Sequence, residues 1–359
     1  MLVTALFLDL SKAFDTVSHS KLLDKLVSYG IKEIEYSWFC DYLFNRSQRV
    51  IYNGNTSDKL NVEIGIPQGS ILGHLLFILF INDFTDCIKN AKVVQYADDT
   101  VLYVSDKCKL QLEKKLSEDI KLASTWFDKN ELMLNLKKGK TEVLTFGTPA
   151  KLRNIDIKVE INDTIIANVN EYKYLGLTVD STLNMRNHFK NVFKKSSGRL
   201  RLLYRLRPDL SQEAAKLLYQ SLIIPVLTYC SLLFINLTNT QQNKLKAFHA
   251  RALDIINWRC QQTIHITSLE LLFKKRACEF VVFCLNTNIE QYRDYFEFTN
   301  HERITRNNGF LLRMPNLKLE YARKSVKYSC CRIFNNLPLD LRKKVFSHSF
   351  KSDIKKYFS

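Results

Sequence analysis

The order of apolar and polar positions in the first part of the chain predicts a strand, two helices and a hairpin. The apolar run at residues 2–8 (LVTALFL) is rich enough for a buried strand, and it ends before Asp9. Between residues 18 and 30 leucines recur on one helical face, and Gly30 provides a stop. A hairpin is expected around YNGNTSD, and the turn GIPQG opens an apolar helix that runs to Asn82.

The hydrophobic period changes near residue 180. A hairpin that carries YADD precedes an amphipathic helix from about Lys109 to Lys129, and short strands are expected around ELMLN, TEVLTF, IDIKVEI and YKYLGLTV. Helical patterns follow in NHFKNVFKKSSGRLRLLYRL, in SQEAAKLLYQSLIIPVLTY and near residues 240–257. The pattern therefore predicts an α+β block over 1–180, a helical region over 181–260, and a remainder over 261–359 whose role stays open.

Two adjacent carboxylates, Asp98 and Asp99, lie between the apolar runs of the YADD hairpin and are expected to form its two-residue tip. At an effective dielectric constant of about 20, like charges about 5 Å apart repel by about 3 kcal/mol, so an ordinary turn would favour Asn-Gly. If the first strand lies beside this hairpin in one sheet, Asp9 joins the pair at one edge. Three carboxylates in a small volume suit a hard divalent cation, and two such ions can activate a 3′-hydroxyl and stabilise a leaving pyrophosphate. Taken singly these signals are weak, because an Asp after a strand is most often a cap or turn residue.

The charge of the chain is strongly basic and unevenly distributed. It carries 53 Lys plus Arg against 36 Asp plus Glu. Residues 1–100 hold 9 basic and 12 acidic side chains, which leaves 44 against 24 in the remainder. This asymmetry indicates a polyanionic partner, and a generally basic surface is the alternative.

Cysteine usage and hydropathy predict an intracellular protein without a membrane segment. Nine cysteines, an odd number without a C-x-x-C pair, argue against a disulfide framework and against a zinc site. The opening MLVTALFL lacks the basic start of a signal peptide, and the apolar run at 71–81 is too short to span a bilayer.

Five stretches resemble, in order and spacing, the palm motifs A to E of the reverse transcriptases of non-LTR (LINE-type) retrotransposons. They are FLDLSKAFDTVSH, GIPQGSILGHLLFILFINDF, QYADDTVLY, LNLKKGKTEVLTFG and YKYLGL, which together cover about residues 3–180. A looser likeness, to the region that follows the thumb, covers TRNNGFLLRMPNLKLEYARKS and RIFNNLPLDLR. The resemblance implies a reverse-transcriptase palm, an antiparallel sheet with helices on one face and partial fingers, over 1–180. A helical thumb over 181–260 and a mostly helical C-terminal region would follow.

The resemblance also implies the chemistry and its residues. Family members bind an RNA template, a DNA primer and deoxynucleoside triphosphates, and they polymerise on two Mg²⁺ ions, with Mn²⁺ as a substitute. The metal ligands would be Asp9, Asp98 and Asp99, with the Leu10 carbonyl as an extra donor. Lys140 would protonate the leaving pyrophosphate, and Lys138 stays open as the alternative because NLKKGKT contains three lysines. No membrane and no obligate protein partner are implied, and the expected location is the nucleus and the cytoplasm.

Further residues match binding positions of the family. Phe14 falls at the aromatic steric gate that excludes ribonucleotides, with an ordinary core Phe as the alternative, and Asp15 is expected to cap the next helix. Gln68 and Gly69 match residues that line the nucleotide and the template base. The hairpin Tyr174, Leu175 and Gly176 matches the primer grip. Basic residues of the helix KNVFKKSSGRLRLLYRLR would contact phosphates, with Val192, Phe193, Leu200, Leu203 and Tyr204 packing inward; these basic residues are Lys190, Lys194, Lys195, Arg199, Arg201, Arg205 and Arg207.

The sequence also departs from the family pattern. The basic fingers segment that precedes motif A, and an endonuclease domain, are not found before Asp9, so a truncated relic that only binds nucleic acid is the competing hypothesis. His74 stands where a proline is usual, and Ser18 where an aspartate is frequent. Group II intron and telomerase-type enzymes use the same kind of palm domain, but motif A, YKYLGL and the tail fit LINE-type sequences better. An RNA-templated RNA polymerase would not be expected to carry Phe14 as a gate.

Overall fold

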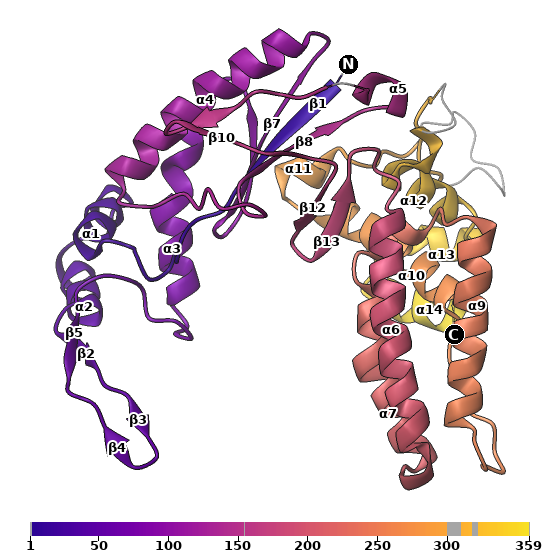
Figure 1. The fold of residues 1–359 in the computed structure, drawn as a ribbon. Coiled ribbons are helices and arrows are strands. Elements are labelled where there is room, and N and C mark those ends of the chain that lie inside the picture. The colour runs from indigo at the N-terminus through magenta and orange to yellow at the C-terminus, as the bar shows by residue number, and fades with distance from the viewer. Residues whose placement is uncertain (1, 154, 300–309, 318–321, 359) are drawn as a thin grey trace. The chain divides into compact units, whose positions relative to one another are not determined.

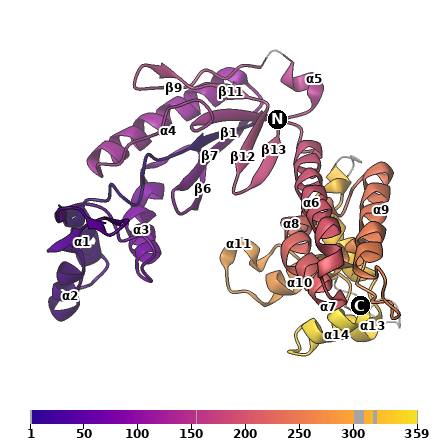
Figure 2. The same cartoon turned by 60° about the horizontal axis from the view of Figure 1, so that its bottom comes forward.

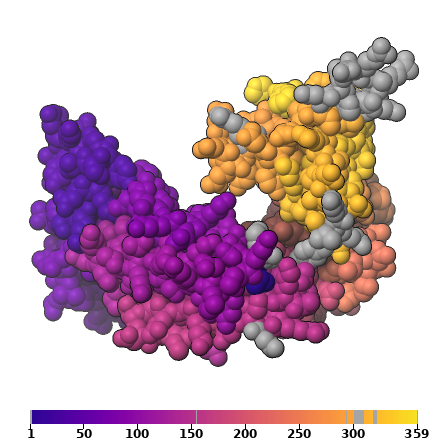
Figure 3. All heavy atoms as spheres, turned by 90° about the horizontal axis from the view of Figure 1, so that it is seen from above, coloured from indigo at the N-terminus to yellow at the C-terminus, as the bar shows by residue number. Residues whose placement is uncertain are grey.

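The computed structural model describes residues 2–153, 155–299, 310–317 and 322–358. The chain divides into two compact units, Met1–Met185 and Arg186–Ser359 (Figure 1), and the bar of Figure 3 identifies the residues of each on the surface. Each unit is described by itself. Parts of the tail that resembles the region after the thumb, residues 305–309 and 318–321, lie outside the described residues.

The first unit combines one principal sheet with helices and short hairpins. In chain order its elements are β1 (Leu2–Leu8), α1 (His19–Ser28), α2 (Glu33–Leu43), β2 (Arg46–Gln48), β3 (Ile51–Tyr52), β4 (Asn55–Thr56), β5 (Leu60–Val62), α3 (Gly73–Ile81), the 3₁₀ turn Asn82–Cys87, β6 (Lys92–Tyr96), β7 (Asp99–Asp106), α4 (Lys109–Lys129), β8 (Glu142–Phe146), α5 (Pro149–Leu152), β9 (Glu160–Ile161), β10 (Thr164–Ile165), β11 (Asn168–Val169), β12 (Glu171–Tyr174) and β13 (Leu177–Asp180).

The principal sheet has five strands in the order β11-β8-β1-β7-β6. Strand β1 lies in the middle, which its almost continuous burial requires, and it pairs antiparallel with β7 and with β8. Strand β6 is antiparallel to β7, whereas β11 is parallel to β8. The sheet is therefore mixed, with one parallel pair at an edge of an otherwise antiparallel sheet.

Each face of the sheet has its own cover. Leu6 and Leu8 of β1 belong to the large core that includes residues of α1, α3 and α4. The ribbon in Figure 2 shows where these elements lie in the first unit. Ala5 and Phe7 alternate with them and point to the opposite face. There the Phe7 ring stacks on Tyr172 of the β12–β13 hairpin, with ring centroids 4.0 Å apart. Helices thus cover one face, as predicted, and the hairpin covers part of the other.

Several predicted elements differ in the structure. ELMLN forms only the isolated bridge between Leu10 and Leu134, and IDIKVEI forms strand only at Glu160–Ile161. Helix α2 was not predicted, because apolar residues such as Ile34 and Trp38 lie on its exposed side and blur the helical period.

The second unit is helical. In chain order its elements are α6 (Arg186–Leu206), the 3₁₀ turn Arg207–Asp209, α7 (Gln212–Leu218), the π-helical turn Tyr219–Ile223, α8 (Ile224–Thr228), the 3₁₀ turn Ser231–Phe234, α9 (Asn239–Ile256), α10 (Leu269–Asn286), α11 (Glu290–Arg293), the 3₁₀ turn Ala322–Lys324, α12 (Val326–Asn335), α13 (Leu339–Lys343) and α14 (Phe350–Tyr357).

Two cores hold the second unit together, and α10 contributes to both. Phe273 belongs to the core built with α6, α7 and α9, and Val281 belongs to the core built with α12 and α14. The single helix predicted over 211–229 is interrupted by the π-helical turn before Pro225, because proline has no N–H to donate to the preceding turn. Within the described ranges, no helix is both long and apolar enough to cross a bilayer.

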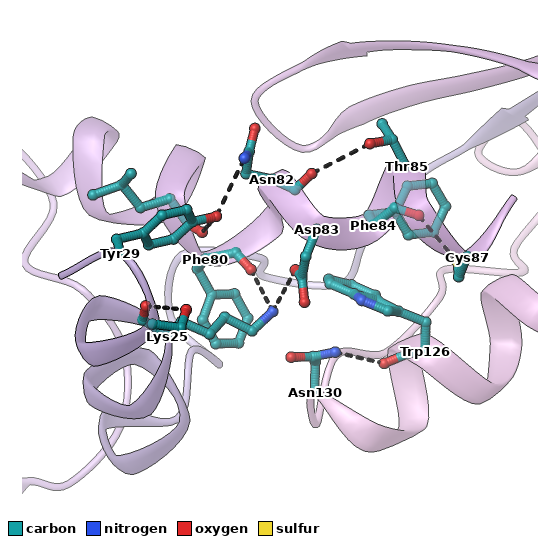
Figure 4. A network of polar contacts seen from close by, with 12 residues as sticks. Lys25, Tyr29, Phe80, Asn82, Asp83, Phe84, Thr85, Cys87, Trp126 and Asn130 are labelled. Carbon is teal, nitrogen blue, oxygen red and sulfur yellow. Dashed lines mark hydrogen bonds and ion pairs between the residues drawn. The ribbon is translucent and has the colours of Figure 1, made fainter.

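A half-buried lysine joins α1 to the end of α3 in the first unit (Figure 4). The Lys25 ammonium donates to the Phe80 carbonyl at 2.7 Å and to Asp83 Oδ1 at 2.6 Å. It also lies 4.7 Å from the Phe80 ring centroid and 4.6 Å from that of Trp126. Burial lowers the pKa of Lys25, and the Asp83 carboxylate opposes that shift. The contacts therefore offset the cost of placing an ammonium group among rings.

We expect Lys25→Met to lower the free energy of unfolding by about 2 kcal/mol, because the variant leaves the Phe80 carbonyl without its charged donor and removes the cation–π contacts. Lys21→Met is the matched control, since Lys21 makes a 3.4 Å ion pair with the exposed Glu131. Such a surface pair contributes about 0–1 kcal/mol. Urea unfolding monitored by circular dichroism compares the two, and equal losses would contradict the role given to Lys25.

Candidate active site

The pairing register of β1 and β7 brings two of the predicted acids together. Leu8 pairs with Thr100, so the next positions along the two strands are Asp9 and Asp99. Cross-strand partners share a face of the sheet, and Phe7 and Val101, two residues away on the two strands, lie on the face covered by β12–β13. Asp9 and Asp99 therefore lie at the end of that face.

The third acid lies in the turn between β6 and β7. Tyr96 pairs with Asp99, so the two residues of the turn are Ala97 and Asp98. The expectation that Asp98 and Asp99 together form the tip is wrong, because Asp99 is the first residue of β7. Ala97 has φ 51° in the left-handed region, which a two-residue hairpin requires.

Both carboxylate oxygens of Asp9 have partners from the segment that precedes β8. Lys140 Nζ lies 3.4 Å from Asp9 Oδ1, and Asn135 Nδ2 donates to Asp9 Oδ2 at 3.0 Å. Asn135 N also donates to the Asp9 carbonyl at 2.8 Å. Both lysines left open by the sequence are exposed, and of the two it is Lys140 that forms an ion pair with Asp9 among the described residues. Asn135 was not predicted, and no motif signal distinguishes it.

The acids interact electrostatically. Burial raises the pKa of Asp99, and the negative charges of Asp98 and Asp9 raise it further, while Lys140 acts in the opposite direction. A proton is therefore held more tightly by Asp99 than by an isolated aspartate, as expected where carboxylates lie close together.

Tyr172 ties the lysine segment to the sheet. Its hydroxyl donates to the Lys140 carbonyl at 2.7 Å, and its ring stacks on Phe7. Burial raises the pKa of Tyr172 to about 12, with Asp9 and Asp99 adding to the shift. Tyr172 was not predicted as a site residue, although the two-residue period of β12 places it on the same face as Tyr174.

The segments of motifs A and B are held against each other by hydrogen bonds. Gln68 Nε2 donates to Asp15 Oδ1 at 2.6 Å, and His19 Nε2 donates to the Gly65 carbonyl at 2.7 Å. The prediction that Asp15 caps the next helix is wrong, because the N-cap of α1 is Ser18 and Asp15 binds Gln68 instead. A cavity of about 680 Å³ borders this pair and reaches β2 and β5.

Phe14 is half-buried at the edge of the large core. Its ring stacks on Phe77 of α3, with centroids 4.4 Å apart, and lies 5.5 Å from the His74 ring. His74, which stands where the family usually has a proline, is thus a direct neighbour of the aromatic ring predicted to be the steric gate. These contacts are compatible with a steric gate and with the alternative, an ordinary core residue.

The motif E segment forms the tight turn between β12 and β13. Tyr174 pairs with Leu177, so Leu175 and Gly176 form the turn, with φ of 46° and 80°. The Tyr174 hydroxyl is buried without a hydrogen-bond partner among the described residues. Burial raises the pKa of Tyr174, and Asp99 adds to the shift.

The basic residues of α6 are mostly solvent-facing. Those that are exposed are Lys190, Lys194, Lys195, Arg201 and Arg205. Arg199 is half-buried and donates to the Leu222 carbonyl, so its side chain is partly committed to packing inside the second unit. Leu200 and Leu203 pack inward as predicted, whereas Tyr204 does not: 43% of it is exposed.

Carboxylate oxygens are the donors that Mg²⁺ prefers, and the negative charges of Asp98 and Asp9 add to the effect of burial in raising the pKa of Asp99. The chemistry of the donor set therefore fits a divalent cation. The geometry of these acids does not by itself form a metal site. Within the described ranges, no group of three or more His, Cys, Asp or Glu side chains is placed so that it could hold a metal ion. Both oxygens of Asp9 have partners, Lys140 and Asn135.

We expect Lys140→Met to raise the pKa of Asp99 further, because the variant removes a nearby cation that favours the ionised carboxylate. Protonation of Asp99 would then persist to higher pH, and the carboxylate would be available for a cation only above that pH. Carboxyl ¹³C shifts of Asp99 followed by NMR during a titration of the metal-free protein measure this. Lys138→Met is the control with the same loss of charge, and a shift of equal size in both variants would contradict the assignment.

Comparison with known proteins gives the class. The family profile for reverse transcriptase (RNA-dependent DNA polymerase) matches residues 3–179. Residues 3–179 are therefore a reverse transcriptase domain, related to the RNA-directed DNA polymerases of non-LTR retrotransposons. This confirms the resemblance and the enzyme family predicted from the five motifs.

Individual relatives agree with this class. The RNA-directed DNA polymerase from mobile element jockey of Drosophila funebris is 27% identical over 259 residues, which are 69% of this chain and 27% of that protein. The Pol polyprotein from type-1 retrotransposable element R2 of Popillia japonica is 24% identical over 184 residues, 49% of this chain and 30% of that protein. The chain thus spans less than a third of the length of either relative. Among solved structures, apo telomerase from Candida tropicalis aligns with 98% of this chain and 52% of its own at 11% identity and a TM-score of 0.39.

Proposed function

We propose that this chain carries out RNA-directed DNA synthesis, with Asp9, Asp98 and Asp99 holding two Mg²⁺ ions, or Mn²⁺ in their place. The observation that supports this most directly is the register of β1 and β7, which sets Asp9 opposite Asp99 beside the turn residue Asp98 in a domain of this family. When bound, such cations supply Lewis acidity toward the primer 3′-hydroxyl and the phosphate oxygens of the incoming nucleotide. The Leu10 carbonyl is proposed as a further donor.

The chain's own residues would position the reacting groups. Lys140 is proposed to hold a proton at Nζ and to give it to the leaving pyrophosphate, and its 3.4 Å contact with Asp9 supports that location. Asn135 and Tyr172 would keep Asp9 and the Lys140 backbone in place through their hydrogen bonds. This geometry needs no rearrangement of the sheet to bring the lysine to the acids.

Binding of the substrates is assigned to the neighbouring elements. Phe14, Gln68 and Gly69 are proposed to contact the deoxynucleotide and the template base, next to the cavity beside Gln68. The turn Tyr174 to Gly176 is proposed to hold the primer end. Residues 1–180 would act as the palm with partial fingers, 181–260 as a thumb, and 261–359 in a role not assigned. The exposed cations of α6 would contact the phosphates of the RNA template and DNA primer; they are Lys190, Lys194, Lys195, Arg201 and Arg205, and Arg199 is partly committed to Leu222.

We expect Phe14→Ala to lower the preference for dTTP over UTP by about 10–200-fold, because one missing steric contact in a pocket has that effect. The ratio of the two kcat/KM values is measured, since a ratio does not depend on the fraction of folded protein. Phe44→Ala, which removes a half-exposed ring that contacts His19, is the control. An unchanged ratio in Phe14→Ala would assign Phe14 to the core alone.

The proposed function is tested by primer extension on poly(rA) with oligo(dT) and dTTP. Extension that requires Mg²⁺ and stops with a chelator is the expected result. The second candidate function is a chain that binds nucleic acid without catalysis, which the exposed cations of α6 favour. Binding of the primer–template without any extension would select that alternative. We place the function inside the cell, in nucleus and cytoplasm, in keeping with nine cysteines that are all free.

A further inference from the structure

The C-terminal end of α6 carries a stack of aromatic rings and guanidinium groups that the proposed catalytic site does not use. The Arg207 guanidinium carbon lies 3.9 Å from the ring centroid of Tyr204, which is one helical turn earlier. The same carbon lies 4.5 Å from the ring centroid of Trp258, just after α9, and the guanidinium carbon of Arg259 lies 4.2 Å from that ring. These four side chains, Tyr204, Arg207, Trp258 and Arg259, are called the ring–guanidinium stack.

The segment that carries Trp258 is held rigidly. Asn257 Oδ1 accepts from Ile264 N at 2.8 Å and from Gln212 Nε2 at 2.8 Å, and Asn257 Nδ2 donates to the Ile264 carbonyl at 3.2 Å. Gln212 Nε2 also donates to the Gln262 carbonyl at 2.8 Å. These bonds fix the loop after α9 against the start of α7, so the stack is preorganised.

The outer members of the stack are open to solvent. Tyr204 is 43% exposed and Arg259 is exposed, while Arg207 and Trp258 between them are half-buried. Neither arginine forms an ion pair with a carboxylate in the part of the chain that the structure describes, and Arg205 adds an exposed cation on α6. The half-buried Arg207 and Trp258 thus hold the centre of the stack. The exposed Tyr204 and Arg259 present planar faces to solvent, beside positive charge that no described carboxylate pairs with.

Planar faces next to guanidinium groups match the chemistry of unpaired nucleotides. Bases that are not paired stack on aromatic rings and on guanidinium planes, while arginine N–H groups bind the phosphates. A duplex keeps the faces of its bases stacked inside, so along its length it presents phosphates, sugars and base edges but no free base face. We propose that the ring–guanidinium stack binds single-stranded nucleic acid, using residues other than those assigned to nucleotide addition. This inference goes beyond the proposed polymerase function and does not depend on it.

The test measures binding of the full chain to fluorescein-labelled ten-nucleotide oligo(rU), oligo(dT) and a fully paired DNA duplex without a loop by fluorescence anisotropy, with a chelator and without nucleotides. We expect Tyr204→Leu to weaken binding of both single strands about tenfold and to leave duplex binding within twofold. Arg259→Gln should reduce the slope of log K against log salt by about 0.7 for the single strands. The relative affinities for oligo(rU) and oligo(dT) of the unchanged chain identify which strand the site prefers.

Matched controls lie in the same unit. Tyr357→Leu removes a ring of similar exposure, 49%, and Lys351→Gln removes one exposed charge. Equal losses in Tyr204→Leu and Tyr357→Leu, or equal losses for single strands and duplex, would overturn the proposal. Thermal melting shows whether each variant is folded. If Trp258→Leu unfolds at a lower temperature than the unchanged chain, the comparison rests on Tyr204→Leu, because Tyr204 is exposed. Because the Asp98→Asn, Asp99→Asn variant should bind the single strands normally, failure of catalysis and failure of this site are distinguishable.

Discussion

The double replacement Asp98→Asn, Asp99→Asn is expected to lower the rate of primer extension at least about a thousandfold. A metal ion supplies several kcal/mol of transition-state stabilisation, and about 4 kcal/mol corresponds to a factor of about a thousand. Asparagine has nearly the same shape but no charge, so the variant removes cation binding with little change in packing. The change also relieves repulsion, because Asp98 and Asp9 raise the pKa of Asp99. We therefore expect unchanged or slightly higher thermal stability.

Single-turnover extension of oligo(dT) on poly(rA) measures the rate, and Asp24→Asn on the exposed side of α1 is the control. The proposed role of Asp98 and Asp99 predicts that activity falls while thermal stability stays the same or rises slightly. A variant that loses activity only in proportion to its unfolded fraction would show that the acids are structural. Activity equal to that of the unchanged chain would exclude the two aspartates from the chemistry.

The second large effect is expected for Gly65→Ala, which should destabilise the first unit by about 3 kcal/mol. Gly65 has φ +88°, a conformation that costs an L-residue about 1–2 kcal/mol. A Cβ there would lie 2.7 Å from the Asp15 carbonyl oxygen, and overpacking of this kind adds about 1–3 kcal/mol. Gly65 N also donates to the Val17 carbonyl at 2.8 Å. The substitution would therefore push the motif B segment away from the motif A segment.

Gly54→Ala separates the two contributions, because Gly54 has φ +78° but nothing within 4 Å of its added Cβ. We expect this control to lose only about 1–2 kcal/mol, the cost of the backbone conformation. Urea unfolding gives both values, and their difference measures the contact between Gly65 and Asp15. Equal losses would show that the close approach of the two segments contributes nothing to stability.

Local patterns along the chain account for much of this fold. The continuous apolar run of β1 predicts a central buried strand, because only a strand covered on both faces needs apolar residues at every position. The period of α4, with buried Leu112, Leu116 and Ile120, predicts one helix over 109–129, where it is found. The five ordered motifs predict the reverse transcriptase family, which the family comparison confirms. These features repeat over a few residues, so short-range chemistry is enough to reveal them.

The placement of the site residues depends on contacts between segments that are far apart in the sequence. Only the pairing register of β1 and β7 sets Asp9 opposite Asp99, and a slip by one residue would have put one of them on the other face. Lys140 rather than Lys138 reaches Asp9 because the loop after Asn135 is fixed by hydrogen bonds to Asp9 and Tyr172.

The same reason applies to the second unit. Tyr204 fits the helical pattern of an inward residue, yet it faces Arg207, which in turn meets Trp258 from beyond α9. Helical period gives the side of a helix on which a residue lies. It does not give which residues of other elements approach that side. Their approach depends on packing between segments some fifty residues apart, which only the three-dimensional fold determines.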